Sequence, residues 1–275
     1  MSKVKWDIPE TQNDSVGDIP SMTVFVDLPS KGLYYPEEVF TNNMESCEIK
    51  FVSGKEEAIL INKDYARNGL TIHKFISALF VDERMKMIPV MDSLMIADVS
   101  ALALAGRNSA YGPEYEVKTK CPNCGNIQQN TYDLSEPKHN CGYVDNQEEL
   151  EGQVEWLGGD KFKVLSTPLK KDEIVFRLLN HRDEMNMRKA LRSKKDYGFK
   201  EQYTPLILSV NGEKGANVVS DYLDNTPAFD LKYIRNLINL CTPELDLKQE
   251  FFCSSCGFSE NEFEIPITEN FLIPH

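Results

Sequence analysis

The sequence predicts an α+β fold, with a mainly helical body, short β-hairpins and a split zinc ribbon that a helical insertion interrupts. Three observations predict it. Several segments repeat apolar residues at helical spacing, short segments alternate apolar and polar residues, and the motif Cys-x-x-Cys-Gly occurs twice with more than a hundred residues between the copies. A chain of 275 residues can bury a sizeable core, as one large domain or two modest ones.

Composition and periodicity divide the chain into four regions. The first region, residues 1–22, is polar, with Pro, Gly and scattered acidic residues. This composition is typical of an arm that is flexible or that becomes ordered only on a partner. The four regions are a flexible N-terminal arm (1–22), an N-terminal α+β region (23–114), a split zinc-ribbon and β region (115–165 with 245–275) and a helical insertion (166–244).

Strand patterns fall in the second and third regions, where β-branched, aromatic or alternating residues are bounded by turn signals. Pro29 and Gly32 predict a turn after the first of them. The expected strands are 23–26, 115–120, 251–252 and 263–265, with a hairpin around 158–160.

Helical patterns place apolar residues three or four positions apart. For one of these helices Asp98 is the candidate N-cap and Gly106 the candidate end. In the longest, acidic residues at the start and basic residues at the end suit the helix dipole, and Glu184 is spaced to pair with Arg188. The expected helices are 70–80, the segment between Asp98 and Gly106, 172–195 and 230–240.

Cys121-Pro122-Asn123-Cys124-Gly125 has the form of a zinc knuckle, and Cys253-Ser254-Ser255-Cys256-Gly257 repeats it. Two residues between the thiolates let both sulfurs reach one ion at ~2.3 Å. The glycine can take a positive φ, which lets the chain turn back into the next strand. We therefore predict one structural Zn²⁺ on Cys121, Cys124, Cys253 and Cys256. Four cysteines close the coordination shell, so the ion contributes folding energy and no chemistry.

Two other interpretations of the cysteines stay open. His139 and Cys141 lie close to the first knuckle and could complete a compact site with it, which would leave the second knuckle without an ion. Alternatively, one Cys-x-x-Cys could be a dithiol redox centre, although such centres usually begin a helix and the flanks here are strands. Cys47 and Cys241 are predicted to be small buried residues.

Composition and motifs narrow the function classes. The formal charge of −13 argues against nucleic acid as the main partner, and no apolar run is long enough to cross a bilayer. The N-terminal residues lack an apolar signal core, so we expect a reducing compartment. The sequence has no nucleophile elbow, phosphate loop or dinucleotide fingerprint, and His73 and His181 have no partner at motif spacing. We therefore expect neither an enzyme nor a small-molecule substrate.

Four stretches together resemble a family of phage tail proteins. They are Leu-Pro-Ser-Lys-Gly at 28–32 followed by Tyr34-Tyr35-Pro36, Arg-Asn-Ser-Ala-Tyr-Gly-Pro-Glu-Tyr at 107–115, the knuckle at Cys121, and Ile-Pro-Ile-x-x-Asn-Phe-Leu-Ile-Pro at 265–274. On these residues the chain is similar to the baseplate hub assembly family of T-even-type contractile phages, whose members are baseplate proteins or hub assembly chaperones. The resemblance covers most of 23–124 and touches the C-terminal ribbon, whereas the insertion has no matching motif. Relatives end in Phe-Phe-Trp-Pro where this chain has Phe-Leu-Ile-Pro, so no role of a terminal tryptophan carries over.

The resemblance implies a non-enzymatic protein in the cytoplasm of an infected host, which helps to build the tail baseplate hub or stays there in the virion. Its partners would be other baseplate, hub or tail proteins. A nucleic-acid-associated zinc-ribbon protein, such as a transcription accessory factor, is the alternative, because zinc ribbons are common in that class and residues 170–200 are locally basic. The residues expected to contact partners or support the fold are Ser30, Lys31, Gly32, Tyr34, Tyr35, Phe271 and Ile273.

Overall fold

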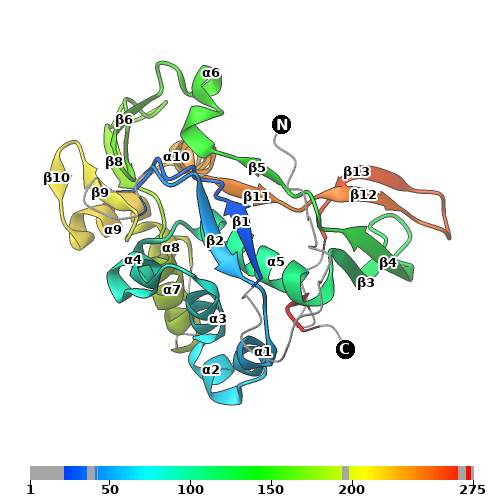
Figure 1. Ribbon diagram of the computed structural model, residues 1–275. Coiled ribbons are helices and arrows are strands. Elements are labelled where there is room, and N and C mark those ends of the chain that lie inside the picture. Colours follow the sequence, from blue (N-terminus) through cyan, green and yellow to red (C-terminus); the bar gives the residue numbers. More distant parts are fainter. Residues whose placement is uncertain (1–21, 36–40, 42, 194–197, 266–270, 274–275) are drawn as a thin grey trace, which may run out of the picture.

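The computed structural model describes residues 22–35, 41, 43–193, 198–265 and 271–273. Within these ranges the chain combines helices with antiparallel strands, so the predicted α+β class is confirmed. A five-stranded sheet lies at one end of the body, and two hairpins project at the other (Figure 1). No helix in the described ranges is long and apolar enough to cross a membrane. The predicted arm lies outside the described residues, apart from Met22.

The N-terminal region pairs two strands and packs helices beside them. β1 (Thr23–Asp27) contains the predicted strand and pairs with β2 (Ser46–Lys50). The predicted helix at 70–80 is confirmed as α3 (Thr71–Leu79), which buries Phe75, Ile76 and Leu79. The other elements here are α1 (Gly54–Leu60), α2 (Lys63–Asn68), the short 3₁₀ helix η1 (Glu83–Lys86) and α4 (Ile88–Ser93).

The helix α5 (Ile96–Tyr111) is central to the body, and both of its predicted ends are wrong. Asp98 does not cap it: this residue lies in the first turn, where its fully buried carboxylate accepts hydrogen bonds from Ser30. The helix also continues past Gly106 and stops at Gly112, whose φ is +80°. A Cβ at Gly106 would lie 2.6 Å from the Leu79 side chain, so this glycine permits a close helix contact.

The five-stranded sheet crosses the predicted boundary between residues 165 and 166. Its strands are all antiparallel and lie in the order β10-β9-β8-β7-β6. The predicted hairpin is confirmed in β6 and β7, with Gly158 and Gly159 at positive φ. The segment 166–244 is therefore not wholly helical. The strands are β6 (Val154–Gly158), β7 (Lys161–Val164), β8 (Ile174–Arg177), β9 (Ile207–Val210) and β10 (Glu213–Lys214).

The predicted helix at 172–195 is wrong in its first part. Residues 174–177 form β8, because pairing with β7 buries Ile174 and Phe176 completely. The helix α7 (His181–Ser193) begins only after Asn180. The Asn180 side chain accepts from the Asp183 N–H at 3.0 Å, and the Asp183 carboxylate accepts from the Asn180 N–H at 3.2 Å. This reciprocal cap fixes the start of the helix.

Further helices complete the body. α10 (Ala228–Cys241) confirms the helix predicted at 230–240, and Cys241 at its end is buried as expected, like Cys47 in β2. Glu184 and Arg188 form the predicted ion pair in α7, at 2.6 Å. The remaining elements are η2 (Gly142–Val144), α6 (Gln147–Leu150), α8 (Phe199–Tyr203) and α9 (Ala216–Asp224).

A two-stranded stem connects the body to the projecting hairpins. In it β5 (Lys138–Asn140) pairs with β11 (Glu244–Asp246), so backbone hydrogen bonds join the two ends of the segment 141–243, which contains most of the predicted insertion. One hairpin consists of β3 (Glu114–Lys120) and β4 (Ile127–Asp133), and the other of β12 (Gln249–Phe252) and β13 (Ser259–Phe263). The predicted strands at 115–120 and 251–252 are confirmed, whereas the last one lies earlier than predicted. Side-chain amides link the hairpins: Gln249 donates to the Asp133 carbonyl, and Gln128 donates to that of Phe252 at 2.7 Å.

Candidate metal centre

The first predicted knuckle forms the tip of the β3–β4 hairpin. The N–H of Cys121 donates to the Asn126 carbonyl at 2.8 Å, and the N–H of Gly125 donates back to the Cys121 carbonyl at 2.9 Å. Gly125 has a φ of +73°, as its place after the second cysteine predicts. These bonds hold Cys121 and Cys124 on the same side of a tight turn.

The second knuckle forms the tip of the β12–β13 hairpin and repeats this pattern. The N–H of Cys253 donates to the Phe258 carbonyl at 2.8 Å, and the N–H of Gly257 donates to the Cys253 carbonyl at 3.0 Å. The φ of Gly257 is +72°. The two tips therefore present their cysteines with matching backbone geometry.

The structure brings all four predicted ligands together. The Sγ atoms of Cys121 and Cys256 are 3.8 Å apart, and those of Cys124 and Cys253 are 3.7 Å apart. All four sulfurs lie within 4.8 Å of one another. Sulfurs bound at ~2.3 Å to one tetrahedral ion are separated by about 3.8 Å. The four cysteines could therefore bind one metal ion with little movement.

The cluster is half sheltered. Cys121 and Cys253 are buried against Phe251, Phe258 and Phe263, whereas Cys124 and Cys256 are exposed. Phe251 stacks on Phe263 with 4.6 Å between the ring centroids, which joins β12 and β13 below the knuckle. This small apolar layer orients the two inner sulfurs, and the outer two face solvent.

The electrostatics of the cluster favour deprotonation of one cysteine and oppose deprotonation of several at once. The pKa of Cys256 is lowered to about 6, first by the backbone N–H of Phe258 and then by the Asn123 side chain. The backbone N–H of Asn126 lowers the pKa of Cys124 in the same way, but the neighbouring thiols outweigh it and raise that pKa to about 12. Crowded thiolates repel one another, and a bound cation offsets that repulsion so that every sulfur can lose its proton.

The compact alternative with His139 and Cys141 is not assembled. Cys141 is fully buried in the body, and its Sγ donates to the Ser30 carbonyl at 3.5 Å. His139 lies in β5, opposite Leu245. In the part of the chain that the structure describes, the four knuckle cysteines are the one group of His, Cys, Asp or Glu placed to hold a metal.

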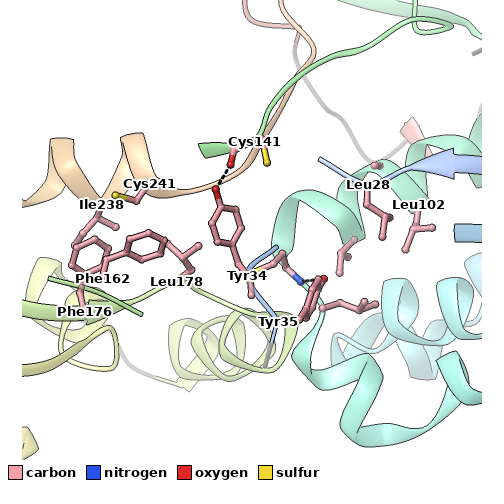
Figure 2. Close-up of a cluster of buried hydrophobic side chains, with 14 of the residues drawn as sticks. Leu28, Tyr34, Tyr35, Leu102, Cys141, Phe162, Phe176, Leu178, Ile238 and Cys241 are labelled. Atoms are coloured by element: carbon pink, nitrogen blue, oxygen red, sulfur yellow. Dashed lines mark hydrogen bonds between the residues drawn. The ribbon is translucent and has the colours of Figure 1, made fainter. Parts of the chain in front are cut away.

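Most of the turn after β1, whose residues are expected to contact partners or support the fold, is built into the core. Ser30 is fully buried, and its N–H and Oγ donate to Asp98 at 2.9 and 2.6 Å. The hydroxyl of buried Tyr35 donates to the same carboxylate at 2.7 Å. Tyr34 is also buried, donates to the Cys141 carbonyl and packs on Phe162 (Figure 2). Because Ser30, Tyr34 and Tyr35 have almost no exposed surface, they support the fold in this structure.

The two residues at the bend of this turn differ in their surroundings. A Cβ at Gly32, whose φ is +69°, would lie 2.2 Å from the backbone nitrogen of Met44, so the site requires glycine. Lys31 has a φ of +50° and keeps an exposed side chain. A partner contact by Lys31 stays a prediction.

The described residues of the C-terminus fold back on the chain. Phe271 is buried and meets the Tyr115 ring edge-on, with 5.3 Å between the centroids. Ile273 is half-buried against the main core. Both residues therefore pack within their own chain in this structure, while 266–270 and 274–275 lie outside the described residues.

Comparisons with models of protein families, with curated proteins and with solved structures found no match. The cysteine cluster and the motif residues of the turn, α5 and the hairpins are thus the features from which a function can be inferred.

Proposed function

We propose that this chain is a non-enzymatic structural or assembly protein of a phage contractile-tail baseplate hub, whose split ribbon is closed by a structural Zn²⁺ on Cys121, Cys124, Cys253 and Cys256. The observation that carries the metal centre is the set of four sulfurs at near-tetrahedral separations. The phage assignment is supported by the resemblance of the motif residues to the hub assembly family.

The donor set favours zinc acting as a structural ion. Four thiolates in a tetrahedron suit Zn²⁺ or iron, and paired knuckles at hairpin tips are the usual zinc ribbon arrangement. Four protein ligands leave no position for water or substrate. An ion held in this way stabilises the hairpin tips and takes no part in a reaction.

Motif residues of the turn and of the stretch 107–115 lie on or against α5, which supports a shared framework. Arg107 is buried and donates to the carbonyls of Gly112 and Glu114. The side chain of Asn108 donates to the Leu134 carbonyl at 2.8 Å. These bonds fix the angle at which the first hairpin leaves the body, so proteins with the same residues would present the ribbon in the same place.

Metal analysis tests the zinc centre. The purified chain is expected to contain about one Zn²⁺, as one tetrahedral site requires. Cys121→Ser and Cys253→Ser should each lose most of it. Cys47→Ala is the matched control, because Cys47 is buried in β2, and it should keep zinc. Full zinc content in both serine variants would disprove the four-cysteine site.

Fractionation of infected cells tests the assembly role. We expect the tagged chain to co-purify with baseplate hub proteins, identified by mass spectrometry. Its presence in mature tails would make it a component, and its presence only in assembly intermediates would make it a chaperone. If it is absent from both, the phage assignment is wrong.

The nucleic-acid alternative has little support from the surface of the second hairpin. Glu250, Glu260, Glu262 and Glu264 are all exposed on the second hairpin or directly after it. Such a surface repels phosphate, whereas nucleic-acid binding needs cationic side chains. We expect no binding to duplex DNA even at low salt. Salt-dependent binding that involves the ribbon would favour the alternative.

A further inference from the structure

The outer side of the second hairpin exposes an aromatic ring among acidic groups. Phe252 is 59 % exposed. Glu250 lies on the same face, because the residue between them, Phe251, points inward. Glu262 is on that face too, since its neighbour Phe263 stacks on Phe251. No lysine or arginine occurs anywhere in residues 249–275.

The outer side of the first hairpin faces in another direction. The Gln128 side chain lies toward the second hairpin, where it donates to the Phe252 carbonyl at 2.7 Å and accepts from the Ser254 N–H at 3.0 Å. Because side chains alternate along a strand, the exposed Ile127 points away from the second hairpin. Glu260 pairs with the inward-facing Phe251 and shares its face. We call Glu250, Phe252 and Glu262 the ribbon patch.

A surface of opposite charge lies on the insertion, where the loop between β7 and β8 meets the start of α10. Leu169 is 59 % exposed and Phe229 is 62 % exposed. The buried Asp230 joins them, because it follows Phe229 and accepts from the Leu169 and Lys170 N–H groups at 2.9 and 3.0 Å. Lys171 and Lys232 are exposed around this pair, whereas the Lys170 ammonium group is paired with the Asp172 carboxylate at 3.5 Å and lies over the Tyr222 ring. We call Leu169, Lys171, Phe229 and Lys232 the insertion patch.

The insertion patch is fixed before any partner arrives. The N–H of Thr167 donates to the Asp172 carbonyl at 2.9 Å, and the Asp172 N–H donates to the Thr167 hydroxyl at 3.0 Å. Lys232 lies one helical turn after Phe229, on the same side of α10. Docking on such a surface requires little ordering of the backbone, which favours association.

We infer that the ribbon patch of one copy docks on the insertion patch of a second copy, head to tail. Each patch combines exposed apolar and charged side chains, and the charges of the two patches are opposite. The sheet and the projecting hairpins lie at opposite ends of the molecule, so the pairing is suited to separate copies (Figure 1). Two ribbon patches would repel each other, which disfavours a symmetric ribbon-to-ribbon contact.

A head-to-tail contact uses different surfaces on the two copies and can repeat, forming a ring when the rotation between copies closes. The inference rests on the proposed function, because the zinc-bound ribbon presents the ribbon patch. An assembly role also requires contacts of this kind. The inference goes beyond that function by naming the partner as a second copy of this chain.

Analytical ultracentrifugation of the zinc-loaded full chain tests the contact over a range of concentrations and at low and high salt. The wild type should associate, and more weakly at high salt. Glu250→Lys/Glu262→Lys and Lys171→Glu/Lys232→Glu should each weaken association by about tenfold or more, because attraction becomes repulsion. The chain carrying all four changes should regain association, since its patches are complementary again. Glu148→Lys/Glu149→Lys is the control with the same charge change on exposed residues of α6, and it should associate like the wild type.

A wild type that stays monomeric at every concentration would overturn the inference and leave both patches to other partners. Failure of the fourfold charge exchange to restore association would overturn it too. Zinc content is measured in the same samples. A zinc-loaded monomer would contradict this inference alone. A chain without zinc would contradict the proposed metal centre, and its sedimentation would still show whether copies associate.

Discussion

Asp98 is a buried carboxylate whose place in the fold depends on hydrogen bonds. Burial raises its pKa, although the donors Ser30 and Tyr35 act in the opposite direction. A raised pKa means that the folded chain holds the proton more tightly than the unfolded chain. The stabilisation from this proton is complete below the ordinary pKa of aspartate, and it is lost as the pH rises through the higher folded-state pKa.

Replacing this carboxylate by an amide is therefore informative. Asp98→Asn should lower the free energy of unfolding by about 1–3 kcal/mol, because its NH₂ group would face donors at Ser30 or Tyr35. The difference from the wild type should be largest at low pH and should narrow as the pH rises. Urea unfolding at several pH values measures it, with the exposed Asp64→Asn as the control. A difference that grows with pH would contradict this account.

His73 and His181 form a pair that their sequence spacing did not reveal. Their rings stack with 5.4 Å between centroids, between α3 and α7, and His181 is buried. Burial and then the neighbouring His181 lower the pKa of His73; Lys74 lowers it further, and Asp92 opposes this. The folded state thus favours the neutral imidazole, so it loses stability as the pH falls through the ordinary histidine pKa near 6.5.

This histidine pair predicts sensitivity to acid. Relative to the wild type, His73→Phe should lose less stability between about pH 7 and pH 5, because it has no imidazole to protonate there. Urea unfolding across that range gives the comparison. His139→Gln in β5, which removes a histidine outside this pair, is the control. Parallel profiles for the wild type and His73→Phe would show that this titration does not affect folding.

At the scale of elements, α5 and α3 approach closely at Gly106. A Cβ there would lie 2.6 Å from the Leu79 side chain and 2.9 Å from that of Phe75. Gly106→Ala gains about 1 kcal/mol of helix propensity, but overpacking a core costs about 1–3 kcal/mol. We therefore expect a lower melting temperature in calorimetry. Gly54→Ala, with no neighbouring atom within 4 Å, should be neutral or stabilising. Equal gains at both glycines would contradict a close helix contact.

Elements with a local signal could be predicted, and those decided by distant partners could not. The alternating residues of β3 and the apolar stripes of α3 and α10 were sufficient to predict these three elements. Residues 174–177 fitted a helical stripe, but pairing with β7 made them a strand. The Asn180–Asp183 cap was a local signal for the true start of the helix and was missed.

The same distinction applies to the candidate site. The cluster of four cysteines could be predicted from the two knuckle motifs, because each motif specifies the ligand type, the ligand spacing and the glycine after the pair. The role of Ser30 could not be predicted, since its acceptor Asp98 lies 68 residues away. Tyr34 likewise depends on Cys141, 107 residues away, so an aromatic motif beside a turn did not reveal that it belongs to the core.

At the scale of the whole molecule, the body and the ribbon differ in how they are stabilised. One apolar core extends from β1 to α10, whereas the knuckles share a small core of Phe251, Phe258, Phe263 and two cysteines. The β5–β11 ladder lies between these parts and holds the two ends of the segment 141–243 together by backbone hydrogen bonds. If the proposed metal is bound, we expect this small core to depend on it and the body to fold without it.

Removing the metal is therefore expected to open the hairpin tips and leave the body folded. In hydrogen exchange measured by mass spectrometry, a chelator should reduce the protection of β12, β13 and the segment 121–127. β8 and α10 should keep theirs, because their hydrogen bonds lie within the main core. Cys253→Ser should give the same pattern without chelator, and Cys47→Ala should not. If β8 and α10 lose protection together with the ribbon, the metal holds the entire fold, and the stem is too weak to keep the insertion closed alone.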